Sequence, residues 1–313
     1  MKILFMGTPD FALPCLKALI ERYDVTAVVT QPDKPRGRGY VLTPPPVKAF
    51  AMENGITVYQ PETLKDGAFE DMLREIDPDA IVVVAYGKIL PAYILDYPKY
   101  GCINVHGSLL PEYRGAAPMQ RAIIDGKAVT GVTTMYMAKG LDTGDMLEKL
   151  ECDIEIDDNF ETVHDKLACL GARLIISTLS KLESGSIIAE KQDDSLATYA
   201  AKIEKCDCVI DFSADVRSIH NRIRGLSPFP LSFAYLGSKM IKFISSEIVS
   251  TVRTDEAPGT VLSLDNKRID ISCGDGVIGI SFLLPEGKKR MSADDFIRGR
   301  QISKGDIFTS DKC

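Results

Sequence analysis

The first 189 residues alternate short apolar runs with amphipathic stretches, which predicts alternating strands and helices. Continuous apolar, β-branched runs are typical of parallel strands that are covered on both faces. The runs that predict strands are Lys2–Met6, Val25–Thr30, Ala80–Ala85, Cys102–His106 and Gly131–Met137. The pattern therefore predicts a doubly wound α/β domain with a mostly parallel, Rossmann-like sheet over residues 1–189.

Two helices are predicted in this part of the chain. Thr8 and Pro9 supply an N-cap and a proline at the first helical position, for a helix that ends near Glu21. A second helix is predicted over Thr162–Leu182, and Gly185 ends it. One apolar face of this second helix is formed by Val163, Leu167, Leu170, Leu174 and Leu182.

The pattern changes after the polar stretch Glu190–Ser195, and we expect residues 190–205 to be a linker. A helix is predicted over Ala214–Arg224, because its apolar positions have helical spacing and Gly225 follows. Short strands separated by turn residues come next, at Met240–Ile244, Thr260–Leu264, Ile269–Cys273 and Val277–Leu283. This spacing predicts a small, OB-like β-barrel as a second domain over residues 206–313.

The composition fits a globular protein, with 45% hydrophobic and 26% charged residues among 313. The longest apolar run, Ala80–Tyr86, is far shorter than the roughly 20 residues that cross a bilayer. Met1-Lys2 leads directly into the first predicted strand, without the pattern of a signal peptide. We therefore expect a cytoplasmic protein with no membrane partner.

The eight cysteines favour neither a disulfide framework nor a metal site. Most stand singly in apolar surroundings, and a chain of this length without secretion signals is rarely held together by disulfides. Cys206 and Cys208 could form half of a zinc site, but no second pair completes the four ligands that a closed site needs. We expect no bound metal.

Charge is distributed unevenly along the chain. The net charge is −7, yet residues 206–313 carry 15 Lys and Arg against 14 Asp and Glu, a net charge of +1. A neutral to basic second half on an acidic protein permits a polyanionic partner without requiring one.

One basic segment, Gln31–Lys48, fits neither pattern. It contains five prolines, two glycines and four basic residues against one Asp, which excludes a helix or a central strand. Lys34, Arg36 and Arg38 could make this segment a finger that contacts phosphates. A proline-stiffened surface loop without such a role is the alternative, although loops of this length are usually functional or disordered.

The densest group of candidate functional residues follows the predicted strand at 102–106. Asn104 and His106 are two positions apart and therefore project from the same face of the strand. An amide can donate to a developing oxyanion and a histidine can exchange protons near neutral pH. Asp142, in a glycine-bounded loop further along, could orient His106 and accept protons.

Other interpretations of these residues remain open. His106 stands at the end of a predicted strand, where a histidine can be structural. Asp142-Thr143-Gly144 is also the sequence of an ordinary turn. A hydrolase that uses Ser108 is disfavoured, because no G-x-S-x-G elbow surrounds this serine. Gly7 lacks the further glycines of a dinucleotide fingerprint, which argues against NAD.

Asn104-x-His106-x-Ser108-Leu109-Leu110-Pro111, with Asp142 downstream, resembles the signature of folate-dependent formyltransferases. Longer segments resemble one branch of them, the methionyl-tRNA formyltransferase family. These segments are FMGTPDFA, QPDKPRGRG, VVVAYGKILP, SLLPEYRGAAPMQ, GLDTGDM and IRGLSPFP, and they extend over essentially the whole chain. The chain departs from the family pattern at Lys202–Phe212, where cysteines replace acidic residues and Phe212 replaces a tryptophan.

The resemblance implies formyl transfer from 10-formyltetrahydrofolate to the α-amine of methionine on initiator tRNA, which supplies translation initiation. It implies that Asn104, His106 and Asp142 are catalytic. The implied folate-binding residues are Ser108, Leu109, Leu110 and Pro111, together with Ala85, Tyr86, Gly87, Ile89 and Leu90 of a second loop.

The resemblance also implies that tRNA is bound by the barrel domain and by the basic segment. The candidate tRNA-binding residues are Lys34, Arg36, Arg38, Arg217 and Arg224. Arg217 and Arg224 lie seven positions apart on one flank of a predicted helix, and we expect a monomer. Glycinamide ribonucleotide and sugar-amine formyltransferases share the catalytic trio, and a non-catalytic RNA-binding protein is a third alternative.

Overall fold

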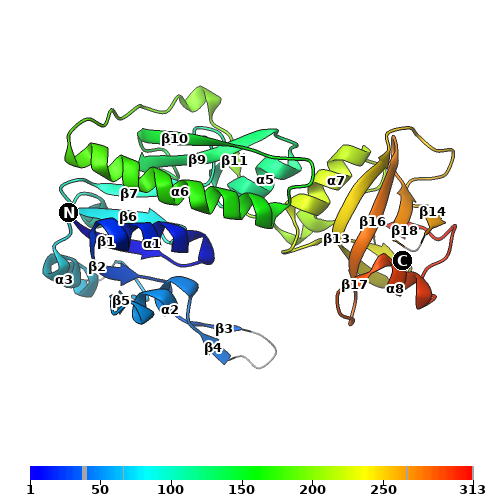
Figure 1. Ribbon diagram of the computed structural model, residues 1–313, viewed down its shortest axis with the longest axis horizontal. Helices are drawn as coiled ribbons and strands as arrows, with labels where there is room; N and C mark the ends of the chain where they lie inside the picture. Colours follow the sequence, from blue (N-terminus) through cyan, green and yellow to red (C-terminus); the bar gives the residue numbers. More distant parts are fainter. Residues whose placement is uncertain (37–40, 66, 266, 312–313) are drawn as a thin grey trace. The chain divides into compact units, whose positions relative to one another are not determined.

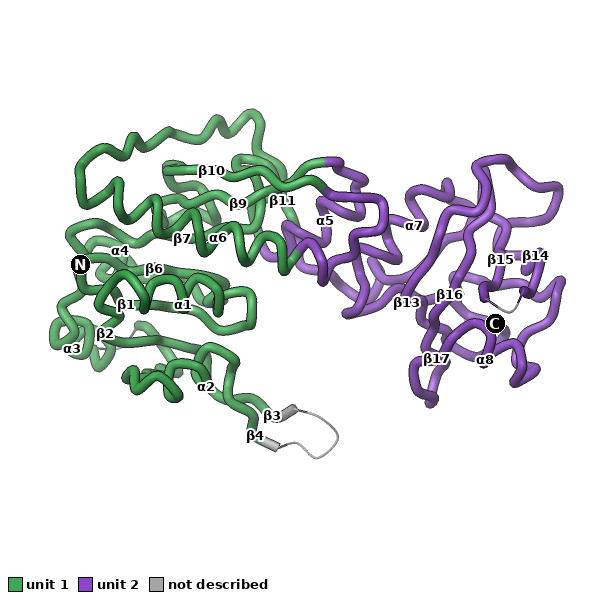
Figure 2. Tube along the Cα trace, viewed as in Figure 1, with its two compact units in different colours: residues 1–115, 129–153, 164–200 green, residues 116–128, 154–163, 201–313 purple. Residues whose placement is uncertain are grey.

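A computed structural model of the chain describes residues 1–36, 41–65, 67–265 and 267–311. The chain divides into two compact units (Figure 2). The N-terminal unit comprises residues 1–115, 129–153 and 164–200, and the C-terminal unit comprises residues 116–128, 154–163 and 201–313. None of the described helices is long and apolar enough to span a membrane.

A seven-stranded sheet forms the centre of the N-terminal unit, in the order β10-β9-β7-β6-β1-β2-β5. The five strands from β7 to β5 are parallel, whereas β9 runs antiparallel to both β7 and β10. The strands are β1 (Lys2–Gly7), β2 (Asp24–Val29), β5 (Thr57–Tyr59), β6 (Ala80–Val84), β7 (Cys102–His106), β9 (Val129–Tyr136) and β10 (Met146–Asp153). The predicted mostly parallel α/β fold is confirmed.

Helices connect and cover these strands (Figure 1). They are α1 (Leu13–Arg22), α2 (Pro46–Glu53), α3 (Gly67–Ile76), α4 (Ala92–Leu95) and α6 (Phe160–Glu183), with a short 3₁₀ turn η1 (Asp10–Ala12) before α1. The helix α6 packs closely on the sheet because Gly171 has no side chain. A Cβ at this position would lie 2.9 Å from Cγ1 of Val105 on β7.

The first helix begins later than its capping signals predict. The α-helix starts at Leu13, whereas Pro9 only precedes the 3₁₀ turn and makes no side-chain cap. The hydroxyl of Thr8 donates instead to the carbonyl of Tyr86, at 3.3 Å. Because this hydroxyl joins β1 to the loop after β6, it cannot cap a helix. The pattern also gave no signal for α2, α3, α4, β5 and β10.

The C-terminal unit contains a curled antiparallel sheet in the order β14-β15-β16-β13-β12-β18, with β17 paired to β16. The strands are β12 (Ser232–Leu236), β13 (Lys239–Ser250), β14 (Val261–Leu264), β15 (Ile269–Ser272), β16 (Val277–Pro285), β17 (Met291–Ser292) and β18 (Phe308–Thr309). The helices are α5 (Pro118–Ile124), α7 (Val216–Gly225) and α8 (Ala293–Arg298), with a 3₁₀ turn η3 (Lys205–Cys208).

The two ends of this sheet are joined by backbone hydrogen bonds. The N–H of Val261 donates to the carbonyl of Asp306 at 2.8 Å, and the N–H of Phe308 donates to that of Gly259 at 2.9 Å. The predicted barrel is therefore a curled sheet whose edges meet. Phe212 packs in its core, with ring centroids 6.0 Å from Phe243 and 5.9 Å from Phe308.

The predicted linker, residues 190–205, is structured in its first part. Residues 190–200 belong to the N-terminal unit and contain η2 (Asp194–Leu196) and β11 (Tyr199–Ala200). The strand β11 pairs in parallel with β8 (Arg114–Gly115). A Cβ at Gly115 would lie 2.7 Å from the carbonyl oxygen of Ala200, so this close pairing requires glycine.

Candidate active site

Asn104 and His106 lie on one face of β7, at its carboxyl end. Asn104 is paired with Val83 of β6 and Met135 of β9, which fixes its backbone on both sides. Its side chain is partly exposed, and its amide has no hydrogen-bond partner among the residues that the structure describes. Because the carboxyl ends of parallel strands are where α/β sheets bind ligands, this amide is available to a substrate.

His106 is held by contacts at both ring nitrogens. Its side chain is 7% exposed, its Nε2 lies 3.0 Å from the carbonyl oxygen of Tyr113, and its Nδ1 lies 3.7 Å from Oδ2 of Asp142. Since a carbonyl only accepts, Nε2 must carry a proton and donate it. Both nitrogens therefore face protein groups, whereas the amide of Asn104 bonds to no described residue.

Asp142 lies in the loop between β9 and β10. Its Oδ2 accepts a hydrogen bond of 2.8 Å from the N–H of Gly115, so one oxygen contacts both this amide and His106. The loop runs close to β9 because Gly144 has no side chain: a Cβ there would lie 1.7 Å from the carbonyl oxygen of Tyr136. The structure thus places Asp142 beside His106, on the strand that also carries Asn104.

The loop after β7 is held by internal hydrogen bonds. The hydroxyl of Ser108 donates to the carbonyl of Glu112 at 2.7 Å, and its own carbonyl accepts from Oγ1 of Thr133 at 2.7 Å. The same Thr133 oxygen accepts from the N–H of Leu110 at 3.1 Å. Ser108 is fully buried, so the structure offers no support for a hydrolase that uses this serine as nucleophile.

The loop Ala85–Leu90 leaves the neighbouring strand β6 at the same edge of the sheet. The carbonyl of Tyr86 accepts from Nε2 of Gln31 at 3.0 Å, which anchors the loop. The ring of Tyr86 is buried, its hydroxyl has no partner among the described residues, and burial raises its pKa to about 12. In contrast, the side chain of Ile89 is 88% exposed. The two predicted folate-binding loops therefore lie side by side, with an uncovered apolar side chain in one of them.

The basic segment contains a short hairpin, although no strand is predicted there. The strands β3 (Lys34–Arg36) and β4 (Val41–Thr43) pair antiparallel, and α2 begins at Pro46 within the predicted loop. Lys34 is exposed, Arg36 is paired through its backbone with Val41, and Arg38 lies outside the described residues.

The base of this hairpin is anchored by an ion pair. Nζ of Lys48 lies 2.8 Å from Asp33 and donates to Oε1 of Gln60 at 2.6 Å. The carboxylate of Asp33 also accepts a hydrogen bond of 2.8 Å from Nε2 of Gln60. The hydrogen bonds from Lys48 first, and then from Gln60, lower the pKa of Asp33. The hairpin therefore starts from a fixed point on the N-terminal unit.

The two candidate RNA-binding arginines of α7 differ in exposure. Arg217 is exposed. Arg224 is 8% exposed, and its guanidinium donates to the carbonyls of Glu155 and Asp158, each at 2.9 Å. This burial argues against the predicted RNA contact of Arg224, because its donors already satisfy backbone carbonyls. The spacing along the helix could not show that residues 155–158 pack against this flank.

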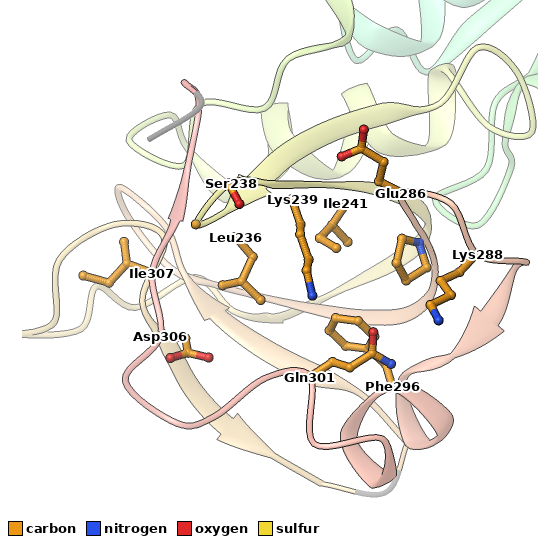
Figure 3. A pocket seen from close by; sticks show the side chains of 12 residues that line it. Leu236, Ser238, Lys239, Ile241, Glu286, Lys288, Phe296, Gln301, Asp306 and Ile307 are labelled. Atoms are coloured by element: carbon orange, nitrogen blue, oxygen red, sulfur yellow. The ribbon is translucent and has the colours of Figure 1, made fainter.

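The C-terminal unit also carries a depression of about 400 Å³. Leu236, Ile241 and Phe296 form its apolar part, and the side chains of Lys239 and Lys288 extend over it (Figure 3). Neither lysine forms an ion pair with a described residue. This depression contains neither Arg217 nor Arg224.

Two buried polar residues of the site were missed by sequence reasoning. Arg114 and Gln192 are both buried and hydrogen-bonded to each other, at 3.0 Å from Nε to Oε1. Arg114 lies within SLLPEYRGAAPMQ, one of the segments that resemble the family, and this position could have marked it as a site residue. Gln192 lies in the polar stretch that predicts a linker, which gives no such signal. Among the described residues, no group of three or more His, Cys, Asp or Glu is placed to hold a metal ion.

Residues 1–179 match the formyl transferase family, and residues 202–301 match the formyl transferase C-terminal domain. The methionyl-tRNA formyltransferase of Citrifermentans bemidjiense is 48% identical over 309 residues, which are 98% of this chain and 96% of the relative. That of Bacillus subtilis is 46% identical and aligns over 98% of this chain and 97% of its own. The chain belongs to the methionyl-tRNA formyltransferase family.

Solved structures with the same fold include more distant proteins. A sugar 3N-formyl transferase, WlaRD, has a TM-score of 0.67 at 20% identity and covers 92% of this chain and 99% of its own. HypX from Aquifex aeolicus, in complex with tetrahydrofolic acid, has a TM-score of 0.65 at 15% identity over 99% of this chain and 50% of its own. At these identities the likeness shows the fold alone. Membership of the methionyl-tRNA formyltransferase family therefore rests on the full-length relatives.

Proposed function

We propose that the protein transfers a formyl group from 10-formyltetrahydrofolate to the α-amine of methionine on initiator tRNA. The product, N-formylmethionyl-tRNA, would serve translation initiation. One observation carries the proposal: the amide of Asn104, which bonds to no described residue, lies beside the His106–Asp142 pair in a chain of the methionyl-tRNA formyltransferase family.

The reaction needs a hydrogen-bond donor for the formyl oxygen, which becomes negatively charged. The lone pair of the amine attacks the formyl carbon, and the electrons of the C=O bond move onto its oxygen. The tetrahedral species then collapses, the bond from carbon to the folate nitrogen breaks, and this nitrogen takes a proton. Asn104 donates to the oxyanion, a contribution worth about 2.7–4 kcal/mol for one such donor in other enzymes.

The reaction also moves one proton from the amine to the leaving nitrogen. The carboxylate of Asp142 accepts the proton from the amine and returns it to the folate nitrogen, directly or through a water. His106 faces the same carboxylate at 3.7 Å, and its Nε2 is tied to Tyr113. His106 therefore stays next to the carboxylate that carries the proton.

The two loops beside Asn104 fit the folate substrate. A pteridine ring is flat and partly apolar, and Ile89 offers an exposed apolar side chain at the edge where both loops emerge. The backbones of the loops are fixed by Thr133 and Gln31, so the loops are ordered before the substrate arrives. No metal is needed for this chemistry.

The C-terminal unit supplies the binding surface for tRNA in this proposal. Arg217 is exposed on α7, and the guanidinium of Arg290 lies 5.1 Å from the ring centre of the partly exposed Phe282. Exposed cations beside an aromatic ring suit a nucleic acid backbone and its bases. The exposed Lys34 on β3 and, outside the described residues, Arg38 complete the proposed contacts. We expect a cytoplasmic monomer.

The test is an assay with purified protein, formyltetrahydrofolate and methionine-charged initiator tRNA. Formation of formylmethionyl-tRNA by the wild type, and its loss in Asn104→Ala, would support the proposal. Parallel reactions offer a nucleotide-linked amino sugar and glycinamide ribonucleotide as acceptors. Formylation of either of these, with none of the tRNA, would show that the protein is a different formyltransferase.

A further inference from the structure

Gln192 holds the loop that carries Asp142. Its side chain is 6% exposed, and its Nε2 donates to the carbonyl of Asp142 at 2.8 Å and to that of Gly144 at 2.7 Å. A primary amide has two N–H donors, so both are used. Asp142 has φ of +52°, a conformation that is uncommon for residues other than glycine. The two hydrogen bonds from Gln192 therefore stabilise a backbone shape that the chain disfavours by itself.

Arg114 holds Gln192 in place. Its side chain is 2% exposed, Nε donates to Oε1 of Gln192 at 3.0 Å, and Nη2 donates to Oδ1 of Asp194 at 2.8 Å. Its backbone N–H donates to the carbonyl of Thr198 at 2.9 Å. These three hydrogen-bond partners of Arg114 come from residues 192–198, about 80 positions later in the chain.

The two neighbours of Arg114 in the chain contact the active site directly. The carbonyl of Tyr113 accepts from Nε2 of His106, and the N–H of Gly115 donates to Oδ2 of Asp142. Fixing Arg114 therefore fixes one contact of His106 and one contact of Asp142. Gln192 fixes the backbone of Asp142 from the other side.

We propose that Gln192 and Arg114 are positioning residues that set the distance between His106 and Asp142. Together with Asp194 and Thr198 they form a clasp, which closes residues 192–198 over the two loops. The proposal rests on the proposed function, in which this pair handles the proton of the attacking amine. Displacing a carboxylate by about an ångström costs activity without removing any group that touches the substrate.

The test compares two substitutions of Gln192 with a matched control. Gln192→Glu keeps the size of the side chain and the oxygen that faces Arg114, but has no N–H for the carbonyls of Asp142 and Gly144. Gln192→Ala removes every hydrogen bond. Lys191→Ala, at the adjacent exposed position, is the control. Thermal unfolding first establishes which variants fold.

We expect both Gln192 variants to lower kcat at least tenfold while KM for tRNA and for formyltetrahydrofolate changes less than threefold. The NMR signals of the His106 ring, recorded without substrates, give a second readout. These signals should shift in the variants, because the carboxylate that lies 3.7 Å from Nδ1 is displaced. Lys191→Ala should match the wild type in both readouts.

Three outcomes would overturn the proposal. They are a kcat within twofold of wild type in either folded variant, a loss of kcat with unchanged NMR signals of the His106 ring, and a Gln192→Glu chain that does not fold. The last result would show that the clasp is needed for the chain to fold, rather than for the distance between His106 and Asp142. If the wild type formylates no tRNA, the proposed function fails, whereas the NMR signals of the His106 ring still test the clasp.

Discussion

Nδ1 of His106 lies 3.7 Å from Oδ2 of Asp142, and that same oxygen accepts a hydrogen bond of 2.8 Å from the N–H of Gly115. The pair is mostly buried, with side-chain exposures of 7% and 15%. The geometry distinguishes His106 from Asn104, because both ring nitrogens of His106 face protein groups, whereas the amide of Asn104 bonds to no described residue.

Asn104→Ala is expected to lower kcat by about 10²–10³-fold, the usual loss when one oxyanion donor is removed. The variant should fold normally, because the amide bonds to no described residue. His106→Ala is expected to lose activity as well, but also some stability, since the carbonyl of Tyr113 then loses its donor. Steady-state kinetics and thermal unfolding of both variants test this difference. A normal kcat in Asn104→Ala would show that Asn104 has no part in the mechanism.

Asp142→Asn keeps an oxygen that can accept from Gly115, but it removes the negative charge. We expect a fall in kcat of about 10²-fold or more, which is typical for loss of a proton-transfer group. KM for formyltetrahydrofolate should stay within about threefold. A variant with normal kcat and weakened folate binding would show that Asp142 binds folate instead of relaying a proton.

Tyr86→Phe is expected to leave KM for formyltetrahydrofolate unchanged, although Tyr86 lies in a predicted folate-binding loop. Its hydroxyl is buried without a partner among the described residues, so its removal should leave the stability equal or raise it by about 1 kcal/mol. Chemical denaturation measures the stability. An increase in KM would mean that the hydroxyl becomes accessible and bonds to the substrate.

Arg217→Ala should affect tRNA binding, whereas Arg224→Ala should affect the stability of the fold. Loss of the exposed Arg217 should weaken tRNA binding and reduce the slope of log K against log salt by about one, as expected for one phosphate contact. Loss of the buried Arg224 should instead cost about 1–3 kcal/mol of stability, because two backbone carbonyls lose their donor. Filter binding over a range of salt, with thermal unfolding, separates the two effects.

The cysteines should differ in reactivity with pH. Burial raises the pKa of Cys15, Cys102 and Cys273 to about 12. A raised pKa favours the neutral thiol, so only about one in 10⁴ of these groups is a thiolate at pH 8. Cys169 and Cys206 are exposed. Iodoacetamide labelling of the native protein at pH 8, read by peptide mass spectrometry, should modify these two first, and rapid labelling of Cys15 would contradict its burial.

The sequence predicts the parts of the fold that depend on local pattern. The strand β6 is an apolar run, and the placement of Asn104 and His106 on one face of β7 follows from the two-residue period of a strand. The start of α1 could not be predicted, because the hydroxyl of Thr8 bonds to Tyr86, 78 positions away. Gln192 was missed for the same physical reason, since its partners are 48 to 78 positions distant.

The clasp has a consequence for the order in which the site forms during synthesis. A nascent chain that has released residues 1–189 from the ribosome contains Asn104, His106 and Asp142, but it still lacks Gln192, Asp194 and Thr198. Protein chains are made from their N-terminus, so the hydrogen bonds from Gln192 to the Asp142 loop form only after the loop itself has been made. The candidate active site of the N-terminal unit can therefore complete the proposed clasp only after the long helix α6 and the residues that follow it have left the ribosome.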